Sequence, residues 1–196
     1  MKAVVSFQGF TESDHRRTGT EDLYFSIIRK FAGPDVTTYQ PRTWTSNVKA
    51  LAYQLNRQGL RHAAMVSYSH GQAAACDFAR HCYGLGISID LWAACDPVYR
   101  PAWLPRKNLF QPLAFRALAR WARILVPANV RRVVWVRQEI SRPQGHELKA
   151  TGPQTYIQKP LVLPYAHTAI DQAPEWFHLV KSELNHWIHP PKAEPV

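Results

Sequence analysis

The chain has 196 residues, 46% of them hydrophobic, which is enough for a single domain with a sizeable core. No apolar run approaches the ~18 residues of a membrane span, and no secretory cleavage site follows the first residues. We therefore expect a cytoplasmic protein without a transmembrane segment, and its formal net charge of +10 favours an anionic surface or polymer as a partner.

Apolar runs alternate with helical periodicities along the first half of the chain. Short apolar runs predict strands at residues 3–7, 35–39, 62–68 and 87–95. Apolar residues at helical spacing predict helices at residues 20–31, 46–59 and 72–83. Ser46 is expected to cap the second of these helices. The repeated alternation predicts an α/β fold, with a doubly wound, mostly parallel sheet in a three-layer sandwich.

The second half of the chain is less regular. Residues 99–108 are rich in proline and basic side chains. The patterns that follow predict a helix at 110–126, a strand at 130–140, a polar loop at 142–153, an extended segment at 156–163 and a last helix at 174–187. The final residues, 189–196, are expected to be disordered, which leaves one domain at 1–188.

A short polar motif interrupts the chain between a predicted strand and a predicted helix. Strand, sharp turn and helix form the context of a nucleophile elbow, in which small residues flank the serine because the two backbones nearly touch. Ser67 and Gly71 are those small residues around Ser69, although the first of them is usually glycine. Ser69 is therefore predicted as a nucleophile, and the alternative is an ordinary strand-to-helix turn.

Two further residues suit the chemistry that Ser69 would need. A serine hydroxyl needs an imidazole to take its proton and a carboxylate to orient that imidazole. Asp96 follows the next predicted strand and should emerge at the same sheet edge, and His167 lies in a loop before the last helix. Taken singly, Asp96 also fits a turn and His167 an ordinary loop. Glu139 is the reserve for the acid, whereas Asp90 is expected to be buried or to point away.

With these features the chain resembles a small α/β-hydrolase of the lipase and esterase kind. Three motifs carry the resemblance: Ser67-Tyr68-Ser69-His70-Gly71, Ala94-Cys95-Asp96-Pro97 and His167-Thr168-Ala169-Ile170-Asp171. Such lipases carry His-Gly-x after an early strand, and the corresponding run here is Gln8-Gly9-Phe10. The resemblance implies that the backbone amides of Phe10 and Gln72 form the oxyanion hole, the latter at a helix N-terminus where the dipole favours an anion.

The resemblance implies a serine hydrolase that cleaves a carboxylic ester or thioester through an acyl-enzyme. Ser69 would be the nucleophile, His167 the base and then the acid, and Asp96 the residue that orients the imidazole. The substrate would be a small-molecule or lipid-like ester, and neither a cofactor nor a metal is expected. The alternative is a non-catalytic binding protein of the same fold, whose basic surface meets an anionic partner.

Basic residues are densest around the predicted helix at 110–126. They are Arg116, Arg120, Arg123, Arg131 and Arg132, the first three of which share one helix face. We interpret them either as a solvated helix face or as a surface for anionic partners. Segment 99–126 follows the predicted acid, so it is interpreted as a cap over the site, and a plain packing helix is the alternative. The three cysteines match no zinc spacing and are interpreted as buried apolar residues.

Overall fold

The computed structural model describes residues 1–9, 18–99 and 122–191. Its main element is a sheet whose strands lie in the order β2-β1-β3-β4-β6-β8, with β9 also paired to β6. Every one of these pairings is parallel. The strands span β1 (Lys2–Phe7), β2 (Val36–Thr38), β3 (His62–Tyr68), β4 (Ser88–Cys95), β6 (Val130–Arg137), β8 (Tyr156–Ile157) and β9 (Leu161–Val162). A separate parallel pair joins β5 (Ile124–Val126) to β7 (Leu148–Ala150).

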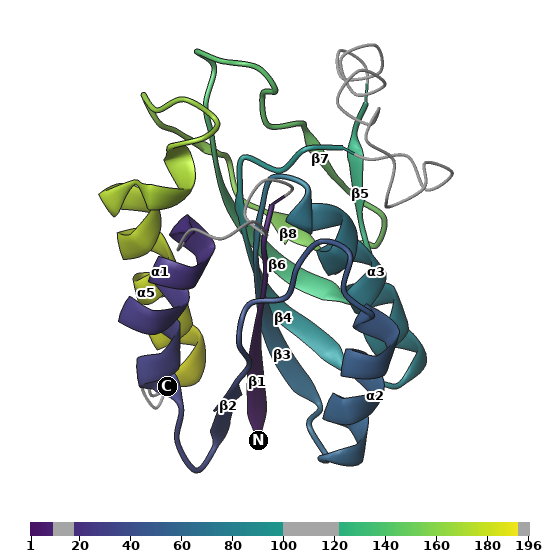
Figure 1. Ribbon diagram of the computed structural model, residues 1–196. Helices are drawn as coiled ribbons and strands as arrows, with labels where there is room; N and C mark the ends of the chain where they lie inside the picture. Colours follow the sequence, from purple (N-terminus) through teal and green to yellow (C-terminus); the bar gives the residue numbers. More distant parts are fainter. Residues whose placement is uncertain (10–17, 100–121, 192–196) are drawn as a thin grey trace, which may run out of the picture.

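Helices cover both faces of the main sheet (Figure 1). Helices α1 (Gly19–Ser26) and α5 (Pro174–Ile188) lie on one face, and α2 (Val48–Arg57) and α3 (Gly71–Gly84) lie on the other. A short 3₁₀ helix, η1 (Ile28–Phe31), follows α1, and a second one, η2 (Ile170–Gln172), precedes α5. The predicted fold class, a three-layer α/β sandwich with a mostly parallel sheet, is confirmed.

Alternate residues of each strand enter different halves of the core, as the two-residue period of a strand requires. Ala3 and Val5 of β1 pack into the cluster under α2 and α3, which includes Phe78. Val4, between them, packs into the cluster under α1 and α5, which includes Trp176. Because β1, β3 and β4 are buried on both faces, these strands are almost continuously apolar, which is the sequence signal that identifies them.

The order of the strands reverses at β1, because the chain leaves β1 toward β2 on one side and later returns to β3 on the other. In open α/β sheets, the carboxyl ends of the strands at such a switch point border a crevice that other groups can enter. The segments that leave β1 and β3 are therefore where this topology favours a functional site.

Two predicted helix boundaries differ from the structure. The helix expected at 20–31 ends at Ser26, because Ile27 leaves the helical region with φ −126° and ψ −63°, and a 3₁₀ turn continues the segment. The cap of α2 is Asn47 rather than Ser46, because the Asn47 side chain accepts the backbone N–H of Ala50 at 3.0 Å.

The region after β4 differs from the predicted elements more than the first half of the chain does. Residues 110–121 of the predicted helix, and most of the predicted cap at 99–126, lie outside the described residues. The predicted end of that helix is wrong, because residues 124–126 form β5, and the loop predicted at 142–153 contains its partner β7. The strand predicted at 130–140 ends at Arg137, and the backbone bends from residue 139 onward. Residues 192–196 of the predicted tail also lie outside the described part of the chain.

The predicted basic surface is not supported as one continuous feature. Arg116 and Arg120 lie outside the described residues. Arg131 pairs with Asp90 at 3.6 Å, and Arg132 pairs with Glu183 at 2.8 Å, so both of these charges are partly balanced within the fold.

Within the described ranges, no helix is long and apolar enough to cross a membrane. All three cysteines are buried, and they form no disulfide.

Candidate active site

The strand register sets the carboxyl ends of three parallel strands level with one another. Tyr68 of β3 pairs with Cys95 of β4, which in turn pairs with Val136 of β6. Ser69 and Asp96 are the first residues past their strands. Their backbone N–H groups extend the ladder, from Ser69 to the Cys95 carbonyl at 3.0 Å and from Asp96 to the Val136 carbonyl at 2.8 Å. The register therefore brings the two side chains to neighbouring positions on one sheet edge.

Both residues have unusual backbone conformations. Ser69 has φ +49° and Asp96 has φ +40°, and among the described residues no other non-glycine residue has a positive φ. Such conformations cost of order 1–3 kcal/mol each and cluster at functional sites. The two strained residues are the predicted nucleophile and the predicted acid.

The turn at Ser69 depends on the absence of a side chain at Gly71. A Cβ atom there would lie 2.4 Å from the Phe7 carbonyl oxygen and 2.7 Å from that of Gln8. The N-terminus of α3 thus lies directly against the end of β1, which is the close backbone approach expected of a nucleophile elbow. Gly9 has a similar role on the β1 side, since a Cβ atom there would lie 3.3 Å from the Ser69 Cβ.

The serine at the other small position has a partner that glycine would lack. The indole N–H of Trp92 on β4 donates a hydrogen bond to Ser67 Oγ at 2.9 Å. Both side chains are almost fully buried, so this bond satisfies a donor that would otherwise be costly to bury. The departure from the usual glycine therefore has a structural reason.

Ser69, His167 and Asp96 lie in one line of hydrogen bonds. Ser69 Oγ is 2.8 Å from His167 Nε2, and His167 Nδ1 is 2.6 Å from Asp96 Oδ2. Asp96 is fully buried, and Ser69 and His167 are 4% and 8% exposed. Because a carboxylate only accepts hydrogen bonds, Nδ1 carries the proton, and Nε2 is then free to accept the Ser69 hydroxyl proton.

Asp96 receives several donors besides the imidazole. Its Oδ1 accepts the backbone N–H of Gly145 at 2.7 Å and that of Gln138 at 3.2 Å. Its Oδ2 accepts the Gln138 side-chain amide at 3.1 Å. A Cβ atom on Gly145 would lie 2.4 Å from Asp96 Oδ1, so only glycine lets this backbone approach the carboxylate so closely. These donors satisfy a buried charge and fix its direction.

The His167 backbone is held from two sides. Its carbonyl oxygen accepts the Tyr68 hydroxyl, and its N–H donates to Ser141 Oγ at 2.7 Å. The Tyr68 and His167 rings are also stacked, with centroids 5.4 Å apart and an interplanar angle of 29°. The residue before the nucleophile thus positions the loop that carries the imidazole.

The alternative acids lie elsewhere. Glu139 has a side chain that is 57% exposed and pairs with Arg137 at 3.3 Å. Asp90 lies near the amino end of β4 and contacts His62 Nδ1 at 2.8 Å, on the sheet edge opposite to Ser69. The structure does not bring either carboxylate to His167.

Of the two predicted oxyanion donors, the structure describes one, the amide of Gln72. Phe10 lies outside the described residues, one position beyond Gly9. The Gln72 amide donates to the Ser69 carbonyl at 3.3 Å, inside the first turn of α3. No side chain caps this end of the helix.

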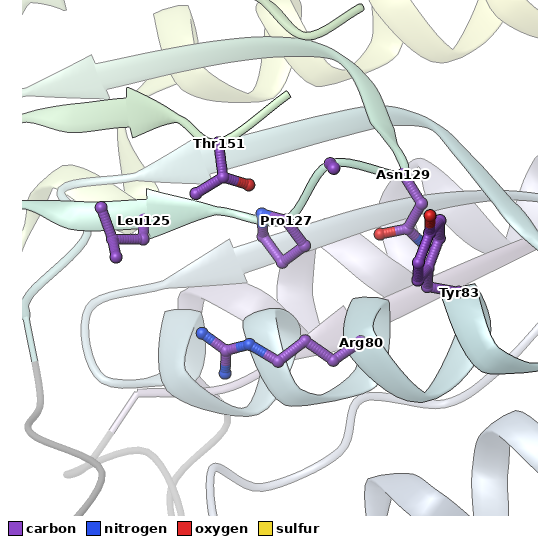
Figure 2. A pocket seen from close by; sticks show the side chains of 7 residues that line it. Arg80, Tyr83, Leu125, Pro127, Asn129 and Thr151 are labelled. Atoms are coloured by element: carbon purple, nitrogen blue, oxygen red, sulfur yellow. The ribbon is translucent and has the colours of Figure 1, made fainter. Parts of the chain in front are cut away.

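A surface cavity of about 320 Å³ lies between α3 and the turn before β6 (Figure 2). Its lining comprises Arg80, Tyr83, Leu125, Pro127, Ala128, Asn129 and Thr151. Because residues 127–129 precede β6, the cavity lies by the amino ends of the parallel strands, and Ser69 follows a carboxyl end. This cavity is therefore separate from the candidate site. Among the described residues, no three His, Cys, Asp or Glu side chains form a metal-binding group.

Sequence reasoning misses the residues that support the three predicted ones. The apolar pattern predicts Gln138 inside a strand, although it is the first residue past β6, at the same sheet edge as Ser69 and Asp96 and one register position further on, since Val136 pairs with Cys95. A polar residue just past the end of a third parallel strand is the available signal. Gly145, Ser141 and Tyr68 act through backbone geometry and loop contacts, for which the sequence carries no comparable pattern.

No protein-family model matches the sequence, and a search of curated proteins gives no match either. Among solved structures, the type II thioesterase BorB from the borrelidin biosynthetic cluster is similar, with 11% identity, a TM-score of 0.47 and coverage of 93% of this chain and 92% of that one. The NocB thioesterase domain, in covalent complex with a fluorophosphonate nocardicin G analogue, has 15% identity, a TM-score of 0.48 and coverage of 95% and 94%. The Vlm2 thioesterase domain has 11% identity, a TM-score of 0.45 and coverage of 94% and 92%. With TM-scores below 0.5, these similarities assign neither a family nor an activity to this chain.

Proposed function

We propose that this protein hydrolyses a carboxylic ester or thioester through an acyl-enzyme on Ser69. The observation that carries the proposal is the continuous hydrogen-bonded line from Ser69 Oγ through His167 to the buried Asp96. This arrangement of nucleophile, base and orienting carboxylate is recognised by its geometry and occurs on unrelated folds. Its position at two strained turns on one sheet edge supports the same interpretation.

The first half of the proposed reaction forms the acyl-enzyme. His167 Nε2 takes the Ser69 hydroxyl proton as Oγ attacks the carbonyl carbon, and the imidazolium that results is stabilised by Asp96 through Nδ1–H. The tetrahedral intermediate then collapses, and the bond to the leaving oxygen or sulfur breaks. Nε2–H gives its proton to the departing alkoxide or thiolate, so an alcohol or a thiol leaves and the imidazole is neutral again. A thiolate needs less of this assistance because it is a weaker base.

The second half releases the acyl group as a carboxylic acid. A water molecule takes the place of the leaving group and gives a proton to His167 Nε2 as it attacks the acyl carbon. The second tetrahedral intermediate breaks its bond to Ser69 Oγ, which recovers the proton from Nε2. The free serine and the neutral imidazole are then ready for another substrate molecule.

The charge on the carbonyl oxygen requires donors beside Ser69. We keep the Phe10 and Gln72 amides as proposed donors and add the amide of His70, because an elbow directs the N–H of the residue after the nucleophile at the developing anion. The Gln72 amide contacts the Ser69 carbonyl and would have to share its hydrogen. The dipole of the fourteen-residue helix α3 favours negative charge at the same place.

Labelling with a fluorophosphonate probe tests this proposal, because the probe needs an activated serine and does not depend on substrate identity. The wild-type chain should be labelled and should hydrolyse both a short p-nitrophenyl ester and a short acyl thioester. Ser69→Ala should abolish labelling and both hydrolyses with little change in thermal stability, since the substitution removes one hydroxyl at an unchanged turn.

Ser26→Ala, at an exposed serine on α1, is the matched control and should behave as the wild type. Wild-type rates in Ser69→Ala would reject Ser69 as the nucleophile. A wild-type chain that neither reacts with the probe nor hydrolyses either substrate would favour the non-catalytic binding protein.

A further inference from the structure

Gln138 is a fully buried polar side chain at the carboxyl edge of the sheet, where it contacts the predicted acid. It is the first residue after β6, which lies beside β4 in the sheet. A buried primary amide has two N–H donors and one oxygen acceptor to satisfy, so the donors and acceptors around it determine which way the amide is oriented.

The nitrogen end of this amide meets only acceptors. Gln138 Nε2 lies 3.1 Å from Asp96 Oδ2, 3.1 Å from the Ser141 carbonyl oxygen and 2.9 Å from the Pro143 carbonyl oxygen. One of its N–H groups can therefore donate to the Asp96 carboxylate while the other holds the loop that follows β6.

The oxygen end meets only donors. Gln138 Oε1 accepts the backbone N–H of Ile140 at 2.9 Å and that of Ser141 at 2.8 Å, and the Ser141 hydroxyl lies at 3.3 Å. If the amide were turned over, its oxygen would face three acceptors and its nitrogen two N–H groups. The surroundings thus allow a single orientation, with the donor toward Asp96.

The same side chain connects Asp96 with the loop that carries the imidazole. Ser141 Oγ donates to Gln138 Oε1 and accepts the backbone N–H of His167 at 2.7 Å. A chain of hydrogen bonds therefore runs from Asp96 Oδ2 through Gln138 and Ser141 to the His167 backbone, beside the direct contact of 2.6 Å between Oδ2 and Nδ1.

We propose that Gln138 is a positioning residue, which fixes the direction of the Asp96 carboxylate and the placement of His167 together. The proposal rests on the function proposed above and adds a residue to that same site. Asp96 Oδ1 is held by two backbone N–H groups, but Gln138 is the one side-chain donor that the described residues give to Oδ2 besides His167. Without it the carboxylate can rotate, and the imidazole loses alignment with Ser69 Oγ.

Two variants separate the roles of the amide. Gln138→Met keeps the length of the side chain and removes both its donor and its acceptor. Gln138→Glu keeps an oxygen for the loop amides but places its second oxygen against Asp96 Oδ2. Gln144→Ala is the matched control, because Gln144 is in the same loop and its Nε2 donates to the Glu139 carbonyl, away from the triad.

Each variant is compared with the wild type in kcat and KM for the p-nitrophenyl ester, in the rate of fluorophosphonate labelling, and in the far-downfield ¹H NMR signal of the proton on His167 Nδ1. We expect kcat and the labelling rate to fall by about tenfold to a hundredfold in Gln138→Met and Gln138→Glu, because small misplacements of catalytic groups cost that much. KM should stay within about twofold, since Gln138 is buried behind the triad and makes no contact with Ser69. The NMR signal should broaden or disappear in both variants, and Gln144→Ala should match the wild type in all of these measurements.

Wild-type kcat and an intact NMR signal in Gln138→Met would overturn the proposal. Full activity in Gln138→Glu would also overturn it, because the side chain would then serve only the loop. If Gln138→Met does not fold, Gln138→Glu carries the test, and failure of both to fold would mean that Gln138 is needed for the loop itself and would likewise contradict a positioning role. The NMR signal does not require turnover, so loss of this signal in a chain whose wild type is inactive would uphold the Gln138 contact while the proposed hydrolysis failed.

Discussion

At the scale of single residues, the directions of the hydrogen bonds around Asp96 are the most informative feature of the site. Oδ1 receives two backbone N–H groups, and Oδ2 receives His167 Nδ1–H and the Gln138 amide. All four of these groups donate, so an ionised carboxylate fits this position and a group with its own hydrogens does not.

Asp96→Asn should therefore reduce turnover by up to about four orders of magnitude. The backbone donors require the Asn oxygen at the Oδ1 position, which leaves its NH₂ group facing His167 Nδ1. The imidazole must then carry its proton on Nε2, where it can no longer accept the Ser69 proton. Steady-state hydrolysis of the p-nitrophenyl ester measures the effect.

Glu139→Gln is the control for that substitution and should leave turnover within a few-fold, because the Glu139 side chain is mostly exposed and pairs with Arg137. The reverse ranking of the two variants would move the acid to the end of β6.

Ser69 and Asp96 are predicted from residue type and from their places after strands, and His167 from its loop before the last helix. The structure brings these three side chains within hydrogen-bonding distance, and their catalytic roles stay a prediction. Gln138 and Gly145 are not predicted from the sequence, because their contacts with Asp96 depend on where β6 ends and on how the following loop folds back. A loop path is decided by many weak contacts, so a local pattern does not encode it. Ser67 is recognisable as a departure from the elbow motif, but its reason, the Trp92 indole, lies on another strand.

At the scale of elements, the junction of β1, β3 and α3 determines the geometry of the turn at Ser69. Helix α3 begins at Gly71, where the backbones of β1 and α3 are in contact. It ends at Gly84, where a Cβ atom would have nothing within 4 Å. The same residue type thus has opposite surroundings at the two ends of one helix.

Gly71→Ala should lower the free energy of unfolding by about 1–3 kcal/mol, because its Cβ would overlap the Phe7 carbonyl and displace the helix. Gly84→Ala should change it by less than about 1 kcal/mol, in the stabilising direction if at all. Urea unfolding of both variants measures the difference. Equal effects at the two positions would contradict the close contact between Gly71 and the end of β1.

Element prediction succeeds where burial imposes a regular pattern and fails where pairing is local. The strands β1, β3 and β4 are buried on both faces and are recognisable as apolar runs. The short strands β5 and β7 stabilise each other, and only Ile124 and Val126 of β5 are buried, so a helical interpretation of the preceding residues extends too far. Hydrogen bonds between two three-residue strands leave almost no trace in a sequence.

At the scale of the whole molecule, the alternation of strands and helices is sufficient to predict the fold class, because right-handed crossovers leave few arrangements for a parallel sheet. The predicted cap stays a prediction, since residues 100–121 lie outside the described ranges. The two halves of the core, one on each side of the sheet, follow directly from the strand period.

The buried thiols give a prediction for the intact fold. Burial raises the pKa of Cys76 and of Cys82 to about 12, from an ordinary value of 9. At pH 8 the thiolate fraction of each is then roughly a thousandfold lower than in the unfolded chain, and the thiolate is the reactive form. A thiol-reactive dye should therefore label the folded protein very slowly and all three cysteines rapidly in guanidinium chloride.

The same pKa shift makes stability depend on alkaline pH. The folded chain keeps both thiols neutral up to about pH 12, whereas the unfolded chain ionises them near pH 9, so the free energy of unfolding should fall as pH rises through this window.

In the labelling experiment, rapid reaction of Cys76 or Cys82 with the dye in the folded state would contradict the burial of these thiols.

The packing of α5 against one face of the sheet also bears on how the chain folds as it leaves the ribosome. Helix α5 covers apolar residues of strands that are synthesised much earlier, through Trp176, Val180 and Leu184. The contact between Ser69 and His167 likewise joins residues 98 positions apart. A nascent chain that has emerged only as far as β6 therefore leaves the part of this face that α5 covers exposed, beside α1, and it lacks the imidazole. Because transiently exposed apolar surface promotes aggregation, we expect such a chain to aggregate more readily than one in which α5 has docked.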